Sequence, residues 1–436
     1  MTLLSLYPSV PLSAVKACAK YALIGGPFGS KLGRSDYVDK GIPVIRGSNL
    51  PDGARFSFDD FVFVTEEKAR DLASNLAFPG DVVVTQRGTL GQVGLIPATS
   101  SYDRFVLSQS QMKLTVDRKR ADSLFVYYAL RSPIGQHEIK SRAITAGVPH
   151  INLSLFQDLQ IPLPPLPVQR RIASILSAYD DLIENNTRRI QILEEMAQAI
   201  YREWFVEFRF PGHEGLRMED SELGPIPEGW CIRALGDVCR RVTDGAHKSP
   251  PSVPEGYAMA SVKDMTPRSL NLASCRRIPP SDYDALVRQD CKPRKGDVLI
   301  AKDGSYLKQV FAVEEERDVV ILSSIALLRP DESIDPWVLA LYLRQPETRE
   351  RLAGYVSGVA IPRIVLKDFK AFRVVLPPSN LQEDFVDIIR PILVLALNFE
   401  QSNAALRQAC DLLLPRLISG EIDVSNLDVG SAEPAA

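Results

Sequence analysis

The sequence lacks any apolar stretch long enough to cross a membrane, and its first residues lack the basic start of a secretory signal peptide. A transmembrane helix needs about 20 consecutive apolar residues, and a signal peptide begins with a positively charged segment. Neither pattern occurs. We therefore expect a cytoplasmic protein that makes no contact with a membrane.

The six cysteines are scattered without a Cys-x-x-Cys pair, and the four histidines show no metal-ligand spacing such as His-Glu-x-x-His. This pattern excludes a disulfide framework and a zinc knuckle. The sequence also has no Asn/Asp-Pro-Pro-aromatic loop of a methyltransferase, no glycine-rich cofactor loop after a strand and no Asp…Glu-x-Lys nuclease core. It therefore predicts no catalytic residue, no metal site and no cofactor in this chain.

The glycine-rich stretch from Gly25 to Lys31 departs from a phosphate-binding loop, because Ser30 stands where that motif needs a glycine before the lysine. We interpret it as a turn whose amides, together with Lys31, can touch a DNA backbone phosphate. Asp81 and Asp297 lie in matching Gly-Asp-Val turns without the rest of a nuclease core. They are predicted to be turn residues rather than catalytic acids.

With 436 residues, of which 45% are hydrophobic and 24% charged, the chain is long enough for at least two globular domains. The net charge is only −3, but it is unevenly distributed. Residues 1–165 carry +4 and residues 209–379 carry +1, whereas residues 166–208 carry −2 and residues 380–423 carry −4. If the protein binds DNA, the mildly basic segments are expected to do so and the acidic segments to face something else.

Two series of mostly apolar residues recur every seven positions after a proline cluster in the middle of the chain. This spacing predicts a long coiled-coil helix, with an estimated length of about 60 Å at about 1.5 Å per residue. One polar residue, Asn186, interrupts the seam and can fix its register. The first series is Ile172, Tyr179, Asn186, Leu193 and Ile200, and the second is Leu176, Ile183, Ile190, Ala197 and Trp204.

The same pattern returns 213 residues later, and its proline and glutamine flanks return with it, so the chain is predicted to be a tandem duplication. Pro391 falls inside the second helix, where a bend or a late start is expected. The predicted domains are a first globular domain (1–165), a first helix (166–210), a linker and second globular domain (211–379), a second helix (380–423) and a flexible tail (424–436).

Aromatic residues gather at the end of the first predicted helix, and they form a larger cluster than a two-helix seam needs. Two interpretations remain open: a docking site for a partner subunit, or a core between packed helices. The residues of this cluster are Tyr201, Trp204, Phe205 and Phe208.

Polar loop residues occupy matching positions in the two halves but differ in type. Arginine pairs with guanine, asparagine or glutamine with adenine, and aspartate with cytosine in the major groove. Two different sets on one framework therefore favour recognition of DNA bases. The first set is Arg46, Ser48, Asn49, Gln86, Arg87, Thr89 and Gln109, to which His150 is added. The second is Ser261, Lys263, Asp264, Lys302, Asp303, Ser305 and Ser324, with Arg363 at the position of His150.

Several segments resemble the conserved regions of type I restriction–modification specificity subunits. The first region is represented by residues 169–173, 180–186 and 199–205, which read QRRIA, DDLIENN and AIYREWF. The C-terminal region is represented by residues 414–422, which read LPRLISGEI. Residues 227–230 (PEGW) and 235–238 (LGDV) resemble the start of a target-recognition domain, whereas the first half has only Tyr7 to Leu12 in that place.

The resemblance implies an α+β fold with two mixed α/β target-recognition domains, held apart by two long antiparallel coiled-coil helices in a pseudo-two-fold tandem repeat. Each domain would read one half of a bipartite double-stranded DNA target. Two methyltransferase subunits would dock on the helices, and motor/endonuclease subunits would join them. S-adenosylmethionine, ATP and Mg²⁺ would belong to those partners, and this chain would not be an enzyme.

Two other readings of the residues stay open. One is a stand-alone nuclease or methyltransferase with an unrecognised site, which turnover by the isolated chain would reveal. The other is a coiled-coil protein adaptor, which would not shift any duplex DNA.

Overall fold

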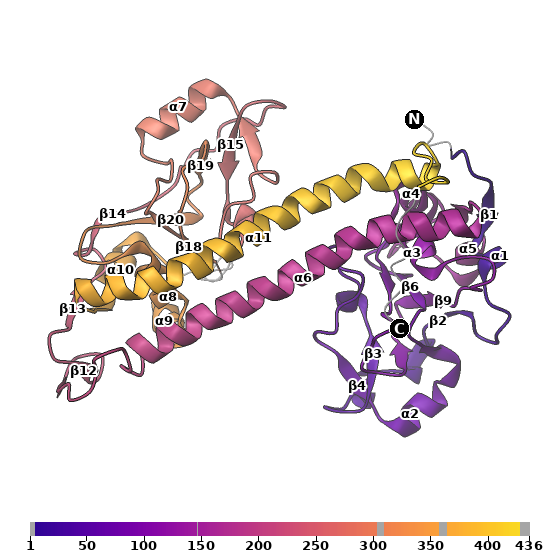
Figure 1. The fold of residues 1–436 in the computed structure, drawn as a ribbon, viewed down its shortest axis with the longest axis horizontal. Helices are drawn as coiled ribbons and strands as arrows, with labels where there is room; N and C mark the ends of the chain where they lie inside the picture. Colours follow the sequence, from indigo (N-terminus) through magenta and orange to yellow (C-terminus); the bar gives the residue numbers. More distant parts are fainter. Residues whose placement is uncertain (1–4, 146, 303–308, 357–363, 428–436) are drawn as a thin grey trace. The chain divides into compact units, whose positions relative to one another are not determined.

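The computed structural model describes residues 5–145, 147–302, 309–356 and 364–427. The chain divides into two compact units, of which unit 1 comprises Met1–Thr187 with Ser402–Ala436 and unit 2 comprises Arg188–Gln401. Each unit holds one globular part and one portion of each of two long helices, α6 (Leu166–Phe205) and α11 (Ser379–Ser419) (Figure 1). Unit 1 is thus assembled from both ends of the chain, whereas unit 2 is one continuous segment.

Helix α11 begins before Pro391 and continues through it, so the expected late start is wrong. A proline inside a helix removes one hydrogen bond and costs about 3 kcal/mol. Pro391 lies on the exposed side of the helix, while Ile389 and Leu393 beside it are buried in the core of unit 2. Burial of the apolar face therefore offsets the local cost of the proline.

Unit 1 contains three small sheets. The first pairs β1 with β10 in antiparallel fashion, the second has the order β2-β9-β6-β7, and the third has the order β4-β3-β8-β5. The strands are β1 (Ser9–Pro11), β2 (Leu23–Gly25), β3 (Ile42–Ile45), β4 (Val62–Val64), β5 (Leu76–Ala77), β6 (Val82–Thr85), β7 (Val93–Leu95), β8 (Phe105–Leu107), β9 (Gln111–Leu114) and β10 (Gln160–Pro162).

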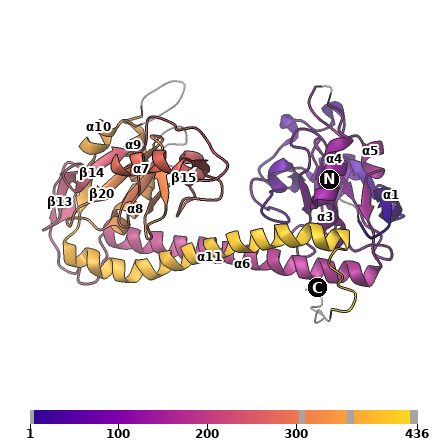
Figure 2. The same ribbon diagram turned by 90° about the horizontal axis from the view of Figure 1, so that it is seen from above.

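Three short helices of unit 1, α3, α4 and α5, begin at polar capping residues. Asp122, Ser132 and Asn152 each accept a hydrogen bond from a backbone amide in the first turn of the helix that follows. Helix α3 is almost wholly buried and lies beside α6, and its residues share one core with Ile172 and Leu176 of that helix (Figure 2). The helices are α1 (Leu12–Val15), α2 (Glu66–Asp71), α3 (Ser123–Arg131), α4 (Pro133–Ser141) and α5 (Leu153–Gln157).

Unit 2 contains sheets of the same kind. Strand β13 pairs with β21, a four-stranded sheet has the order β14-β20-β17-β18, and a three-stranded sheet has the order β16-β15-β19. The strands are β11 (Met218–Glu219), β12 (Ile226–Pro227), β13 (Cys231–Ala234), β14 (Cys239–Asp244), β15 (Tyr257–Ala260), β16 (Arg276–Ile278), β17 (Val298–Ala301), β18 (Val310–Ala312), β19 (Val319–Ile321), β20 (Ile325–Pro330) and β21 (Arg373–Leu376). The short helices are α7 (Pro280–Arg288), α8 (Pro336–Arg344), α9 (Pro346–Ala353) and α10 (Leu366–Ala371).

The two globular parts repeat one topology. In each, one sheet has an inner strand that pairs antiparallel with one neighbour and parallel with the other, as β3 does with β4 and β8, and β15 with β16 and β19. Strand β1 takes the place of β13, so the first half has a counterpart of that strand although it lacks the PEGW motif. The parallel registers align Leu107 with Ile321, which matches Gln109 with Ser323. The predicted match of Gln109 with Ser324 is therefore wrong by one position.

Within unit 1, the early part of α6 packs against the late part of α11. Ile172 and Leu176 share a core with Leu417 and Ile418. Further along, the Nδ2 of Asn186 donates to the Oδ1 of Asn403 at 3.0 Å, and both side chains are buried. The two helix segments of this unit therefore run antiparallel. The polar residue that interrupts the predicted seam has a polar partner on the other helix.

Candidate nucleic-acid interface

Four loops of unit 1 meet at one end of its sheets, and Gln109 holds two of them together. Its Nε2 donates to the backbone carbonyls of Gly29 at 2.6 Å and Leu32 at 2.9 Å. The Nε2 of Gln86 in turn donates to the carbonyl of Gln109 at 2.5 Å. The segment that carries the exposed Lys31 is thus bound to the turn between β8 and β9.

The loop after β6 contacts the segment that carries His150. The backbone of Arg87 pairs with that of His150, and the amide of Gly88 donates to the carbonyl of Pro149 at 3.2 Å. The side chains of Arg87 and Thr89 are exposed. The sequence singled out each of these loop residues separately, and the fold brings them to one surface. They are Lys31, Gln86, Arg87, Thr89, Gln109 and His150.

Close packing explains why the stretch from Gly25 to Lys31 contains a glycine at position 26. A Cβ atom on Gly26 would lie 1.8 Å from the carbonyl oxygen of Ser108, so only glycine allows this close approach. Gly245 stands in the corresponding place of unit 2, where a Cβ would lie 2.1 Å from the carbonyl oxygen of Ile321. Both glycines let the loop after an edge strand, β2 in unit 1 and β14 in unit 2, pack on a neighbouring turn.

The 3-10 helix Gly47–Asn49 follows β3 at the same end of the sheets. Asn49 is fully buried: its Oδ1 accepts from the amide of Arg46 at 2.9 Å, and its Nδ2 donates to the carbonyl of Asp59 at 2.9 Å. Its predicted role as a base reader is wrong, because every group that would contact a base is already bound within the loop. Ser48 is exposed, and the guanidinium of Arg46 donates to the carbonyl of Asp60.

The corresponding end of unit 2 is built differently. The Nζ of Lys302 lies 2.9 Å from the Oδ2 of Asp244, and both side chains are buried. The imidazole of His247 lies 3.1 Å from the other oxygen of Asp244 and is exposed. Lys302 is therefore a buried partner of Asp244 rather than a side chain that reaches a base, which corrects the prediction made for it.

Asp264 repeats the arrangement of Asn49. Its Oδ2 accepts from the amide of Ser261 at 2.8 Å, and its Oδ1 accepts from the hydroxyl of Ser274 at 2.8 Å. This buried carboxylate fixes a loop, so its predicted role in reading bases is also wrong. Lys263 remains exposed beside it. The predicted base readers Asp303, Ser305 and Arg363 lie outside the described residues.

Sequence reasoning missed Asp244 and His247. The available signal was the segment TDGAH (residues 243–247), which occupies the place of the glycine-rich stretch of the first half. His247 is one of the four histidines without metal-ligand spacing, so no motif singles it out. Alignment of the two halves through Gly26 and Gly245 would have placed it at the interface.

The two aspartates of the Gly-Asp-Val turns are confirmed as turn residues. The Oδ2 of Asp81 accepts from the amide of Phe78 at 2.9 Å, and that of Asp297 accepts from the amide of Arg294 at 2.8 Å. Each carboxylate also pairs with a cation on the neighbouring strand, Lys113 for Asp81 at 2.8 Å and Arg329 for Asp297 at 2.7 Å.

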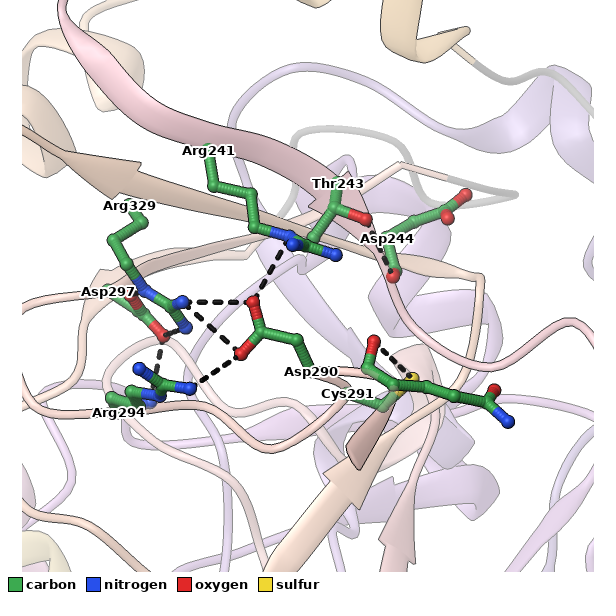
Figure 3. Close-up of polar contacts among 9 residues, drawn as sticks. Arg241, Thr243, Asp244, Asp290, Cys291, Arg294, Asp297 and Arg329 are labelled. Carbon is green, nitrogen blue, oxygen red and sulfur yellow. Dashed lines mark hydrogen bonds and ion pairs between the residues drawn. The ribbon is translucent and has the colours of Figure 1, made fainter. Parts of the chain in front are cut away.

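In unit 2 the turn aspartate belongs to a larger ionic network (Figure 3). The guanidinium of Arg329 contacts Asp290 at 3.0 Å as well as Asp297. Asp290 also pairs with Arg241 at 3.1 Å and Arg294 at 3.0 Å. Because every carboxylate in it is neutralised by arginine, this network stabilises the sheet and does not offer a free acid for catalysis.

The aromatic cluster at the end of α6 forms part of the core of unit 2. Tyr201, Trp204 and Phe205 are buried there, and Phe208 packs against the same core. The ring of Phe385 on α11 lies 4.6 Å from that of Phe205 and 5.6 Å from that of Trp204. The packing-core interpretation therefore accounts for the three buried rings, and Phe208 is half-buried beside them.

The described part of the chain holds no cluster of three or more His, Cys, Asp or Glu side chains arranged to bind a metal ion. Among the same residues, no helix is both long enough and apolar enough to cross a membrane.

Comparison with known proteins agrees with this architecture. Residues 30–195 match the family model of the type I restriction modification DNA specificity domain. The specificity subunit of the type I restriction enzyme MjaIX from Methanocaldococcus jannaschii is 23% identical over 84% of this chain and 82% of its own length. The EcoBI specificity subunit from Escherichia coli is 25% identical over 76% of this chain and 73% of its own.

The fold is also found in a solved structure. The crystal structure of the type I restriction–modification S subunit from M. genitalium matches 95% of this chain and 96% of its own with a TM-score of 0.58 at 17% identity. The matched DNA-specificity domain and the relatives along most of the chain make this chain similar to type I restriction–modification specificity subunits, and the solved S subunit shares its fold.

Proposed function

We propose that each globular part reads one half of a bipartite DNA target from the major groove. Target-recognition domain 1 would comprise residues 1–165, and domain 2 would lie within residues 211–379. The repeated frame with different exposed side chains carries this proposal. One unit offers Arg87, Thr89 and His150, and the other offers Lys263 and His247. Because base edges are distinguished by donor and acceptor pattern, different side chains on one frame would read different sequences.

The surrounding charge supports binding to DNA. Residues 1–165 carry a net +4, and exposed Lys31 and Arg87 lie at the loop surface of unit 1. Phosphate contacts position a protein on the duplex, whereas base contacts specify the sequence. Lys31 is assigned to phosphate contact and Arg87 to base contact.

We further propose that α6 and α11 form an antiparallel coiled coil that sets the distance between the half-sites and docks two methyltransferase subunits. Both helices are acidic and expose apolar side chains that are not used in their own packing. We assign these exposed apolar positions to the contact with the methyltransferase subunits. Motor/endonuclease subunits would join this complex, and S-adenosylmethionine, ATP and Mg²⁺ would be bound by the partners. The exposed residues are Leu182, Ile192, Met196, Ile388, Leu395 and Leu412.

The test is methylation-site sequencing of DNA from cells that express this chain with its methyltransferase subunit. Arg87→Ala is expected to relax or change one half-site and leave the other half-site and the spacer unchanged, because loss of a bidentate base contact costs about 1–3 kcal/mol of discrimination. Arg118→Ala is the matched control, since this exposed arginine follows the opposite end of β9.

A methylated motif without two separated halves would contradict the proposal. An unchanged motif in the Arg87→Ala variant would contradict the assignment of the loop surface. Methyl transfer by the purified chain alone would instead show that the chain is an enzyme.

A further inference from the structure

Each globular part is joined to the long helices of its own unit by a buried or half-buried arginine. In unit 1 this is Arg55, which lies in the loop between β3 and β4. In unit 2 it is Arg268, which lies in the corresponding loop between β15 and β16. The two residues are 213 positions apart, the same offset that relates the helices.

In unit 1, Arg55 contacts α6 alone. Its Nε and Nη2 donate to the two carboxylate oxygens of Glu184 at 3.1 and 3.0 Å, and Nη2 also contacts Asp181. This bidentate contact has a defined geometry. The carboxylate side chains are nevertheless 59% exposed in Asp181 and 41% exposed in Glu184, so water competes for them.

In unit 2, Arg268 contacts both helices. Its Nη1 lies 2.8 Å from Glu194 on α6, and its Nε lies 3.2 Å from Glu400 on α11. Arg344, at the end of α8, adds a second cation at 2.9 Å from Glu194. The side chains are shielded from water, with exposed fractions of 14% for Arg268, 19% for Glu194 and 21% for Glu400.

The backbone that carries Arg268 is itself held in place. The hydroxyl of Thr266 accepts from the amide of Ser269 at 2.9 Å, and the amide of Thr266 donates to the carbonyl of Ser269 at 2.9 Å. Arg268 therefore projects from a closed turn. A planar guanidinium on a fixed turn, bound to two helices, resists rotation of the globular part relative to the helices of unit 2.

We propose that Arg268 is a positioning residue that fixes the angle of the second recognition domain on the helix pair, and thereby the spacer length that the complex accepts. The inference rests on the proposed bipartite reading of DNA. Arg268 touches no base in this scheme: it acts through the orientation of the loops that do. Arg55 performs the same task in unit 1 with a weaker, single-helix contact.

The test uses the complex of the full chain with its methyltransferase subunit and a set of duplexes whose spacers differ by one base pair. The readout is the rate of methylation of each off-length duplex divided by the rate on the optimal one. In the Arg268→Gln variant this ratio is expected to rise roughly tenfold, which converts to about 1.4 kcal/mol of discrimination. Both half-site sequences should stay the same.

Further variants separate positioning from a general loss of structure. Glu400→Gln removes only the contact to α11 and should broaden the spacer profile in the same direction, even where Arg268→Gln yields too little folded complex to assay. Arg268→Lys keeps the charge but loses the planar fork, so it should restore the profile only in part. Arg240→Gln is the control, because Arg240 pairs with Glu332 in the same unit and both are largely exposed.

The outcomes are distinguishable. A wild-type complex that shows no spacer preference would overturn the proposed function itself. A sharp wild-type preference that persists in both Arg268→Gln and Glu400→Gln would overturn only the role of Arg268. A broadened profile in the Arg240→Gln control would also overturn it, since any loss of surface charge would then suffice.

Discussion

The two units order their corresponding strands alike, although β5 of unit 1 and the β11-β12 pair of unit 2 lack counterparts, and they differ in how they fill the space beside the sheet that contains β3 or β15. Unit 1 fills it with a cluster of aromatic rings, whose neighbouring centroids lie 5.3 to 6.4 Å apart. Unit 2 leaves a cavity of about 230 Å³ there, lined by Leu299, Phe311, Val313 and Val319 among others. The rings of unit 1 belong to Phe56, Phe58, Phe61, Phe63, Tyr102 and Phe105.

Strand register explains part of this difference. The parallel pairs align Phe105 with Val319, so a smaller side chain stands where unit 1 has a ring. The strand frame is preserved although the side chains that pack on it are not. The comparison shows that strand order and loop positions are fixed by backbone pairing, while the core beside the loops is free to vary.

The helix pairs differ as well. In unit 2 the two long helices are joined by edge-on and tilted aromatic rings, whereas in unit 1 the contact includes the Asn186–Asn403 hydrogen bond. A buried amide pair contributes little net free energy but is costly to break on one side. We therefore expect buried apolar area to stabilise the contact between the helices in unit 2. In unit 1, we expect part of the contact to fix the register of the two helices instead.

The largest expected effect tests the filled core. Phe105→Ala should lower the free energy of unfolding of unit 1 by about 4 kcal/mol, because it empties a fully buried ring site. The matched change Val319→Ala in unit 2 should cost much less, since it enlarges a cavity that already exists. Amide hydrogen exchange reports each unit separately. Equal losses in the two units would show that the cavity does not loosen the core of unit 2.

The next effect separates packing from docking on α6. Trp204→Ala should destabilise unit 2 by about 3 kcal/mol, because the ring is buried against Phe385. Met196→Glu, at an exposed position on the same helix, should leave the melting temperature unchanged and abolish co-purification of the methyltransferase subunit. A co-purified complex with Met196→Glu would contradict docking at this face.

A smaller effect is expected at the asparagine pair. Asn186→Leu should destabilise unit 1 by about 2 kcal/mol, because it leaves the buried amide of Asn403 without its partner. The double change Asn186→Leu with Asn403→Leu should recover most of that loss, since two apolar side chains replace the pair. Urea denaturation of the three variants measures both values. A double variant as unstable as the single one would show that the pair stabilises the fold outright.

The helices were the most predictable part of the molecule. Their heptads are long and their flanks repeat, so their approximate bounds followed from periodicity alone. Pro391 was the exception. Proline usually breaks a helix, but here burial of the apolar helix face next to it outweighs that tendency. Asn403 belongs to the repeated series, but its partnership with Asn186 depends on antiparallel pairing, which the spacing alone does not specify.

The loop surface was only partly predictable. Residue type suggested Arg87 and Gln109, which lie exposed at the loop surface, but it equally suggested Asn49, Asp264 and Lys302, which the fold buries. Composition cannot separate a polar side chain that satisfies its own loop from one that faces a ligand. That distinction is made by backbone groups from distant segments, such as the amides of Arg46 and Ser261.

The assembly of unit 1 from both chain ends has a consequence for synthesis on the ribosome. The residues of α11 that cover Ile172 and Leu176 are translated only after the whole of unit 2. At about 5–20 residues per second, the apolar side of the first helix waits roughly 12–50 s for its cover. Unit 2 is complete before unit 1 can close, so the first-made half of the protein is the last to be finished.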